Sequence, residues 1–221
     1  MSDHRSRFLR LALHAQALRF GEFTLKSGRR SPYFFNAGRF DSGARLAELA
    51  ACYADAVEES GVSFDLLFGP AYKGIPLATA LGCEYARRGR DLPLAFNRKE
   101  AKAHGEGGTL IGAPMADRRV LIVDDVITAG TAIREALALI GDAGGTPAGI
   151  VVALDRQEIL REDDPERRSA AQSVAVETGV PVIAVASLRD LLAFAGENAE
   201  LVGHRDQLLA YRARYGSAAA G

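Results

Sequence analysis

The chain has 221 residues, of which 48% are hydrophobic and 25% are charged. These proportions are close to the average for globular proteins and argue against disorder, and no stretch reaches the roughly 20 consecutive apolar residues that a membrane-spanning helix needs. Lys and Arg number 27 and Asp and Glu 28, for a formal net charge of -1, which excludes an overall attraction to nucleic acid. We therefore expect a cytoplasmic protein with one α/β core, without nucleic-acid or membrane partners, and with any anion site confined to a local patch.

The N-terminal region does not follow the pattern of the rest of the chain. Residues 1–20 are apolar at helical spacing but interrupted by arginines, which predicts an amphipathic helix. The segment FGEFTLKSGRRSPYFFN, residues 20–36, then indicates two short strands joined by a Ser/Gly/Arg turn. We expect residues 1 to about 40 to form a small antiparallel cap, or hood.

From residue 42 onward, helical patterns alternate with short apolar runs. A helix is predicted after Ser42, ending near Gly61. The apolar runs that follow are at 64–68, 94–96, 120–123, 149–154 and 180–185, and the helical patterns between them are at 75–88, 132–143 and 164–178. Strands that alternate with helices and read as unbroken apolar runs indicate parallel βαβ units.

The predicted fold is a Rossmann-like α/β fold, an open and mostly parallel sheet flanked by helices, with the hood added at its N-terminus. Its core spans about residues 60–185, and C-terminal helices occupy about 187–221, all within a single domain. Residues 198–215 read as a last helix, followed by a frayed Gly/Ala end. Cys52 and Cys83 lie inside predicted helices without a C-x-x-C motif, so we expect two buried, inert thiols.

Polar or glycine-rich segments follow four of the apolar runs. They are GPAYKG at 69–74, NRKEAKAHGEGG at 97–108, DDVITAGT at 124–131 and DRQE at 155–158. The carboxyl ends of parallel strands lie on one edge of a sheet, where ligands bind in open α/β folds. The four segments are therefore expected to meet on one rim.

The segment DDVITAGT has the features of an anion site. A turn that leads into a helix near Gly130 offers free N–H groups and the positive end of the helix dipole, although Thr128 or Thr131 could instead simply cap the helix. Asp124 and Asp125 could be a solvated strand end, a metal site, or acceptors for a sugar diol. Two acceptors directly before a phosphate-binding turn suit a phosphorylated ribose.

Clustered cations mark two other segments. Arg98, Lys99, Lys102 and His104 lie within seven positions and are followed by glycines, which fits either an exposed charged loop or a lid that closes over a polyanion. Lys73 in GPAYKG adds a cation at another strand end.

The segment VLIVDDVITAGTA, residues 120–132, resembles the phosphoribosyl pyrophosphate motif of the type I phosphoribosyltransferases. Together with FTLKSGRRSPYFFN, GPAYKGIP and FNRKEAKAHGEGG, it makes the chain similar to the orotate phosphoribosyltransferases. The resemblance implies the type I phosphoribosyltransferase fold and a homodimer that transfers ribose 5-phosphate from phosphoribosyl pyrophosphate to orotate. The products are orotidine 5-monophosphate, an intermediate of UMP biosynthesis, and pyrophosphate, and Mg²⁺ is expected to travel with the donor rather than in an all-protein site.

The resemblance also implies a role for each matched residue in binding the donor. Asp124 and Asp125 would hold the ribose hydroxyls, and the 5-phosphate would lie in the turn of Val126, Ile127, Thr128, Ala129, Gly130, Thr131 and Ala132. The pyrophosphate would meet the Tyr72 backbone, Lys73, Lys26 and the lid residues Arg98, Lys99, Lys102 and His104, with Lys99 acting in the partner subunit's site. The catalytic residues would be Lys26, Arg98, Lys99, Lys102, His104, Asp124 and Asp125.

For the base, the resemblance implies that Phe34 and Phe35 position the orotate ring, that Thr128 approaches it, and that Arg156 pairs with its carboxylate. Read alone, Arg156 could be a salt-bridge partner of Glu158, one phenylalanine could be core packing, and Lys26 could be an ordinary turn residue.

Two alternative functions stay open at this point. A transferase for a purine or uracil is disfavoured by the phenylalanine pair and Arg156, because a neutral base needs no cation. A regulator that senses the donor is disfavoured by the lid cations.

Overall fold

The computed structural model describes residues 3–25, 27–102, 108–160, 165–199 and 201–218, without the side chains of 101, 102 and 108. In this part of the chain a six-stranded sheet has the order β5-β4-β3-β6-β7-β8, and every neighbouring pair is parallel except β4 and β5. The strands are β3 (Leu66–Gly69), β4 (Leu94–Lys102), β5 (Gly108–Gly112), β6 (Arg119–Asp124), β7 (Thr146–Asp155) and β8 (Val182–Ser187).

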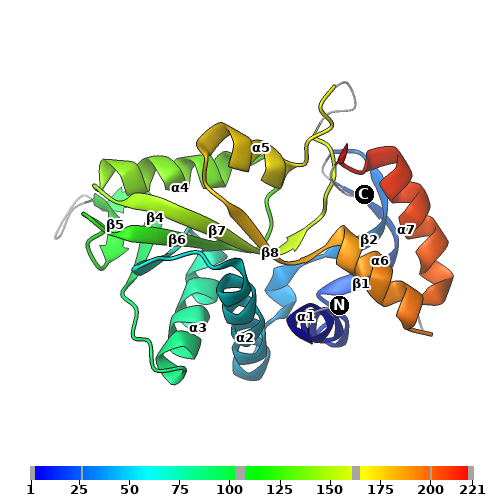
Figure 1. Ribbon diagram of the computed structural model, residues 1–221, viewed down its shortest axis with the longest axis horizontal. Coiled ribbons are helices and arrows are strands. Elements are labelled where there is room, and N and C mark those ends of the chain that lie inside the picture. The colour runs from blue at the N-terminus through cyan, green and yellow to red at the C-terminus, as the bar shows by residue number, and fades with distance from the viewer. Residues whose placement is uncertain (1–2, 26, 103–107, 161–164, 200, 219–221) are drawn as a thin grey trace.

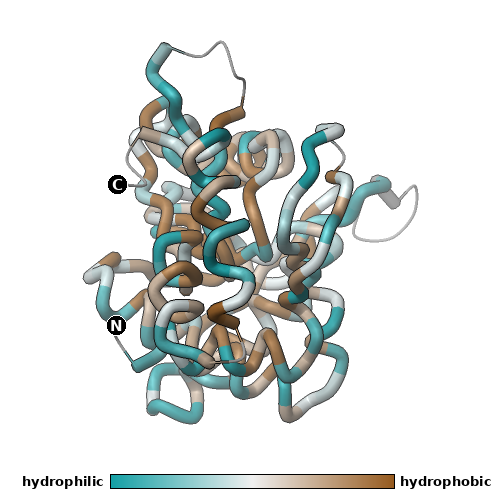
Figure 2. Tube along the Cα trace, turned by 90° about the vertical axis from the view of Figure 1, so that its right-hand side faces the viewer, coloured by the Kyte–Doolittle hydropathy of each residue, from teal (hydrophilic) through white to brown (hydrophobic). Residues whose placement is uncertain are grey.

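Helices cover both faces of this sheet (Figure 1). On one face lie α2 (Gly43–Ser60) and α3 (Gly74–Arg87), and on the other α4 (Thr131–Asp142) and α5 (Ala170–Thr178). Val120–Val123 of β6 are completely buried between the two layers, which explains their unbroken apolar sequence. Hydrophobic segments gather in the interior and hydrophilic ones in the outer loops (Figure 2). The predicted fold class, an open and mostly parallel sheet flanked by helices, is confirmed.

The hood lies at one end of the molecule together with both ends of the chain (Figure 1). Its two antiparallel strands form a separate sheet, as predicted. The elements of this end are α1 (Asp3–His14), β1 (Leu18–Thr24), β2 (Arg30–Phe35), the short 3-10 helix η1 (Ala37–Arg39), α6 (Leu188–Glu197) and α7 (Val202–Tyr215). One hydrophobic cluster joins residues of these elements to the sheet, while the organisation as a single domain stays a prediction.

Two segments differ from the sequence prediction because pairing with distant residues determines them. Residues 97–108 were expected to be loop, but β4 continues to Lys102, and the edge strand β5 pairs with β4 from Gly112 back to Gly108. The helix predicted at 164–178 begins only at Ala170. Ser169 is its cap: the Ser169 hydroxyl accepts from the Gln172 N–H, and the backbone of Ser169 forms a bridge with Ile159 outside the helix.

The two ends of the chain also differ from expectation. The predicted N-terminal helix stops at His14, and Leu18–Phe20 belong to β1. The last helix begins at Val202, after a separate helix α6 that Ser187 caps. The tail was expected to fray, but Ser217 N–H donates to Gln157 O at 2.8 Å, and Ala218 N–H donates to a backbone oxygen at 3.0 Å. Residues 216–218 are therefore attached to the segment that follows β7.

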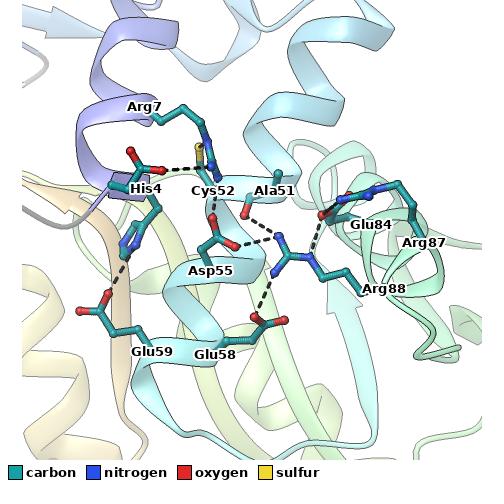
Figure 3. A network of polar contacts seen from close by, with 11 residues as sticks. His4, Arg7, Ala51, Cys52, Asp55, Glu58, Glu59, Glu84, Arg87 and Arg88 are labelled. Carbon is teal, nitrogen blue, oxygen red and sulfur yellow. Dashed lines mark hydrogen bonds and ion pairs between the residues drawn. The ribbon is translucent and has the colours of Figure 1, made fainter.

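A network of charged side chains joins α1, α2 and α3 (Figure 3). Asp55 on α2 accepts from Arg7 of α1 at 2.6 Å and from Arg88 after α3 at 2.8 Å. Arg7 Nε also donates to Cys52 Sγ at 3.4 Å, and this cysteine is buried, as predicted. The same prediction was wrong for Cys83, which lies on the exposed face of α3.

Candidate active site

The loops after β3 and β6 meet strand β4 at the carboxyl edge of the sheet, as expected for these segments; residues 103–107, after β4, lie outside the described residues. Asn97 of β4 accepts the Ala71 N–H at 2.8 Å, and Lys73 Nζ lies 2.6 Å from Asp125 Oδ2. The loop after β3 comes very close to β6, because a β-carbon at Gly74 would lie 2.7 Å from the Val123 oxygen. Glycine at this position therefore allows the loop to lie against the end of β6.

The two aspartates occupy different environments. Asp125 is buried and pairs with Lys73, while Asp124 Oδ1 accepts the Asp125 N–H at 2.9 Å. The hydroxyl of Tyr53, from α2, donates to Asp124 O at 2.8 Å and fixes the backbone there. Burial, together with the neighbouring charge of Asp125, raises the pKa of Asp124 to about 6. Ionisation of Asp124 is thus disfavoured in the ligand-free site.

The turn before α4 is open toward an anion. Gly130 is the N-cap residue, with a left-handed backbone (φ 77°), and no side chain caps the helix. The alternative that Thr128 or Thr131 caps α4 is therefore wrong, and both threonines are exposed. The first helical hydrogen bond of α4 runs from Arg134 N–H to Gly130 O, so the preceding N–H groups lie ahead of the helical ladder. A hollow of about 230 Å³ is lined by Asp124 and residues 126–133.

Of the side chains predicted to meet the pyrophosphate, the structure describes those of Lys73, Arg98 and Lys99. Lys73 is 57% exposed, and Tyr72, 67% exposed, lies under the Lys99 ammonium, 4.9 Å from ring centroid to nitrogen. Arg98 has a buried Nη1 without a hydrogen-bond partner among the described residues. Lys26 and His104 lie outside the described residues, as does the side chain of Lys102. The visible cations therefore come from β4 and from the loop after β3.

The two phenylalanines of the hood lie on opposite faces of β2. Phe35 is buried and packs against Phe8 and Phe40, with ring centroids 6.1 Å and 6.3 Å away. Phe34 is half-buried on the other face, 5.5 Å from the Phe23 ring. The expectation that one of the pair belongs to the core is confirmed for Phe35.

Arg156 follows β7 and points into a buried polar group of the hood. Its Nη2 lies 2.6 Å from Glu158 Oε1 and 3.2 Å from Ser31 Oγ, and its guanidinium carbon lies 4.4 Å from the Tyr33 ring centroid. The salt bridge with Glu158 that the sequence offered as an alternative is thus present. Burial acts to lower the pKa of Arg156, but Tyr33 and the Glu158 carboxylate raise it overall, so the cation is retained.

No helix in the described ranges is long and apolar enough to cross a membrane. The cytoplasmic location stays a prediction. Among the same residues, no group of three or more His, Cys, Asp and Glu side chains is arranged to hold a metal ion.

Comparison with known proteins identifies the family. The model of the phosphoribosyl transferase domain matches residues 40–180. A protein of Xanthomonas campestris pv. campestris, named orotate phosphoribosyltransferase, is 78% identical over 217 residues, which cover 98% of both chains. The chain belongs to the orotate phosphoribosyltransferases. A relative with the same name in Stenotrophomonas maltophilia is 76% identical over 216 residues, again 98% of both chains.

A solved structure agrees with this family. The crystal structure of the orotate phosphoribosyltransferase of Francisella tularensis has a TM-score of 0.85 and 44% sequence identity, and the match covers 95% of this chain and 99% of that one. The matched domain, residues 40–180, contains the loops after β3, β4 and β6, whereas the match to the Francisella structure extends over the hood as well.

Several residues of the site were not found by reading the sequence. Tyr53 and Asn97 are ordinary members of a helix and a strand until the fold brings them to the loops, and no local signal marks them. Ser31 and Tyr33 are part of the quoted motif SPYFFN, but their contact with Arg156 crosses about 125 residues of chain.

Proposed function

We propose that this site transfers the 5-phosphoribosyl group of phosphoribosyl pyrophosphate to a ring nitrogen of orotate, which yields orotidine 5-monophosphate and pyrophosphate. The reaction is a step of pyrimidine biosynthesis toward UMP. One observation carries the proposal. Two acceptors, Asp124 and Asp125, are followed directly by the uncapped N-terminus of α4, and residues of this segment line a hollow of about 230 Å³. The ring hydroxyls and the 5-phosphate of one ribose, a few bonds apart, fit such a pair of neighbouring subsites.

The ribose 5-phosphate would lie along β6 and the turn before α4. Asp124 and Asp125 accept hydrogen bonds from the two ribose hydroxyls, and the phosphate receives N–H groups and hydroxyls from residues 126–132. The raised pKa of Asp124 supports this role, because hydroxyl donors stabilise the ionised carboxylate that the free site disfavours.

The departing pyrophosphate would meet cations from two directions. The loop after β3 contributes Lys73 and the Tyr72 backbone. The segment from Asn97 in β4 to Gly112 at the end of β5, here called the β4–β5 arm, contributes Arg98, Lys99, Lys102 and His104. The hood contributes Lys26. The buried Arg98 Nη1, which has no partner among the described residues, supports an anionic ligand at that place. These cations stabilise the negative charge that builds on the leaving group as the bond to the anomeric carbon breaks.

Orotate would lie between the hood and the rim. Phe34 covers the ring, the Phe35 backbone follows in the same strand, Thr128 approaches from the turn, and Arg156 pairs with the carboxylate. The exposed position of Thr128 and the half-buried ring of Phe34 support this arrangement. Phe35 contributes through the core, which holds β2 in place.

Mg²⁺ would enter with the donor. The carboxylates of Asp124 and Asp125 are the oxygen donors that this ion prefers, and a pair of them fits an ion that keeps water and substrate oxygens. When bound, Mg²⁺ neutralises part of the pyrophosphate charge.

We also propose that two copies form the active enzyme and that Lys99 acts in the partner's site. Apolar side chains exposed near the β4–β5 arm support such a contact, namely Tyr72, Leu110 and Ile111. Mixing inactive Lys99→Ala protein with inactive Asp125→Asn protein should restore part of the activity, because one of the two sites in a mixed dimer carries both native residues. Absence of restoration would place Lys99 in its own chain's site.

The proposed reaction is tested by incubating the protein with orotate, phosphoribosyl pyrophosphate and Mg²⁺ and following the loss of orotate absorbance. Asp125→Asn should abolish turnover, whereas Asp65→Asn, at the opposite edge of the sheet and paired with Arg119, should not. Consumption of uracil or hypoxanthine in place of orotate would contradict the assignment of the base.

A further inference from the structure

The guanidinium of Arg156 is held on several sides. Its Nε donates to Glu158 Oε1 at 2.8 Å, and its Nη2 lies 2.6 Å from the same oxygen and 3.2 Å from Ser31 Oγ. Tyr33 lies against its face, with the guanidinium carbon 4.4 Å from the ring centroid. Nη1 makes no hydrogen bond of ordinary geometry to a residue in the described part of the chain, although the Tyr211 hydroxyl lies close to the guanidinium. One donor of the fork is therefore left for a ligand.

Glu158 is itself fixed from both sides. Its side chain is 13% exposed, and Oε1 accepts from the Tyr33 hydroxyl at 3.4 Å. The backbone around it pairs with the C-terminal segment: Glu158 forms a bridge with Gly216, and the N–H of Ile159 donates to Tyr215 O at 2.9 Å. The carboxylate is thus held by the backbone as well as by side-chain contacts.

The Glu158 carboxylate offsets part of the free energy that burial of the Arg156 guanidinium costs. A guanidinium as buried as that of Arg156, 14% exposed, is costly without a counter-charge, and it would otherwise rotate away or recruit another anion. Glu158 supplies the nearby negative charge and occupies one edge of the fork, while the Tyr33 ring limits its tilt. The other oxygen of Glu158, Oε2, lies 4.0 Å from Arg29 Nη1, so the carboxylate is shared by two guanidiniums. A preorganised fork loses little conformational freedom when an anion binds to the remaining donor.

We propose that Glu158 is a positioning residue that makes the enzyme prefer a pyrimidine carrying a carboxylate. It does not touch the substrate. It holds the Arg156 guanidinium so that the free donor faces the carboxylate of orotate. The inference rests on the proposed role of Arg156 in binding that carboxylate, and it adds a specificity-determining residue outside the contact surface.

The test separates two effects of Glu158: it positions the Arg156 guanidinium, or it competes with the ligand carboxylate for that guanidinium. Because Glu158 is a negative charge beside Arg156 and Arg29, its removal would strengthen the attraction for an anion if the Arg156 guanidinium stayed in place. Loss of affinity on removal therefore identifies positioning, and gain of affinity identifies competition.

Binding of orotidine 5-monophosphate and of uridine 5-monophosphate, measured by calorimetry, isolates the carboxylate, because the two nucleotides differ only in that group. Glu158→Ala should weaken binding of orotidine 5-monophosphate about tenfold or more, the loss expected for a charge-assisted hydrogen bond, and leave uridine 5-monophosphate unchanged. Glu158→Gln keeps the shape and an acceptor oxygen but not the charge, so it should fall between Glu158→Ala and the native protein. In turnover, the KM for orotate should rise while the KM for the donor and kcat change little.

Three further proteins complete the experiment. Arg156→Ala should weaken binding of orotidine 5-monophosphate alone, and adding Glu158→Ala to it should cause no further loss. Glu22→Gln, which breaks an exposed hood ion pair with Arg30 (2.8 Å), should change neither affinity.

The outcomes distinguish the inference from the function beneath it. The deciding quantity is the preference for orotidine 5-monophosphate over uridine 5-monophosphate. If Arg156→Ala leaves this preference unchanged, Arg156 does not bind the carboxylate and the inference is contradicted with it. If Arg156→Ala lowers the preference but both Glu158 variants leave it unchanged or raise it, only the positioning role is overturned. Equal weakening of both nucleotides by Glu158→Gln would mean a general loss of structure and would also overturn it.

Discussion

The ε-ammonium of Lys73 lies 2.6 Å from Oδ2 of Asp125, so the loop after β3 and the end of β6 are joined by a partly buried ion pair in the ligand-free site. The Asp125 side chain is 9% exposed and that of Lys73 is 57% exposed. A cation proposed for the pyrophosphate is thus paired, before substrate arrives, with a carboxylate proposed for the ribose. In the proposed reaction the donor would bind to both members of an existing pair.

Replacing Lys73 should mainly weaken donor binding. Lys73→Ala removes a charge-assisted contact to the pyrophosphate, and kcat/KM for the donor should fall about tenfold to a hundredfold while the KM for orotate changes little. Steady-state kinetics with each substrate varied in turn measures this. Arg119→Gln breaks an exposed ion pair with Asp65 at the other end of β6 and should leave both constants unchanged. Equal effects of the two variants would contradict a local role for Lys73.

Asp124→Asn should stabilise the free protein while it abolishes turnover. The pKa of Asp124 is about 6 in the folded protein against an ordinary 3.8, so the folded state binds this proton more tightly than the unfolded state. Stability is therefore lost as pH rises from about 4 to about 6, by at most about 3 kcal/mol, and an uncharged Asn avoids that loss.

The check on Asp124→Asn is thermal unfolding across pH. The variant should exceed the native protein in Tm at pH 7 to 8, and the difference should shrink as pH falls below about 6 and Asp124 becomes protonated. A constant difference across this range would mean that the ionisation of Asp124 is not its cause.

Arg98 should be more important for the donor than for the fold. Its Nη1 is buried without a partner among the described residues, and such a group costs stability rather than adding it. Arg98→Leu should therefore leave the free energy of unfolding in urea unchanged or raise it by about 1 kcal/mol, while the KM for the donor rises. Arg98→Lys, which keeps the charge, should have the smaller kinetic effect. A fall in stability with unchanged KM would assign Arg98 to the fold.

The turn before α4 depends on glycine at position 130. Its backbone is left-handed (φ 77°), and a β-carbon would lie 2.9 Å from both Arg134 Nη1 and Val174 Cγ2. Gly130→Ala should therefore cost more than about 1 kcal/mol of stability and raise the KM for the donor. Gly141→Ala is the matched control in the same helix, because nothing lies within 4 Å of its β-carbon, and it should stabilise by about 0.5 to 1 kcal/mol.

The C-terminal segment should influence the base site from a distance. Removing residues 216–221 deletes the backbone partners of Gln157 and Glu158, so the KM for orotate should rise more than the KM for the donor. Removing only 219–221 keeps the Gly216 bridge and the Ser217 and Ala218 hydrogen bonds and serves as the control. Identical kinetics for the two truncated proteins would contradict this link.

The sequence predicts the parts of the fold that local patterns encode. Ser42 and Gly61 cap α2 as expected, because a hydroxyl accepts from an N–H in the first turn and glycine adopts the left-handed cap. Buried parallel strands such as β6 are equally predictable from the sequence, because both of their faces are covered and they therefore form unbroken apolar runs. The rim was predictable because strand ends in such a sheet share an edge.

What local patterns do not encode is pairing across long separations. Strand β5 is determined by its pairing with β4, in which Phe96 is opposite Ile111. No local pattern in residues 97–108 predicts this pairing. The contact of Arg29 with Tyr215, 4.9 Å from guanidinium carbon to ring centroid, joins opposite ends of the chain. At the site, chemistry by residue type was predictable, whereas partners such as Ser31 and Tyr33 required the fold.

The hood packs against the last helix of the chain: Tyr33 of β2 lies edge-on against Tyr211 of α7, with ring centroids 6.2 Å apart. During synthesis, β6 and the turn that follows it leave the ribosome long before α7 does. The phosphate turn can thus form on a nascent chain, whereas the surroundings of Arg156 cannot be completed until translation has passed Tyr211. The proposed phosphate turn is therefore synthesised well before the last element that surrounds Arg156.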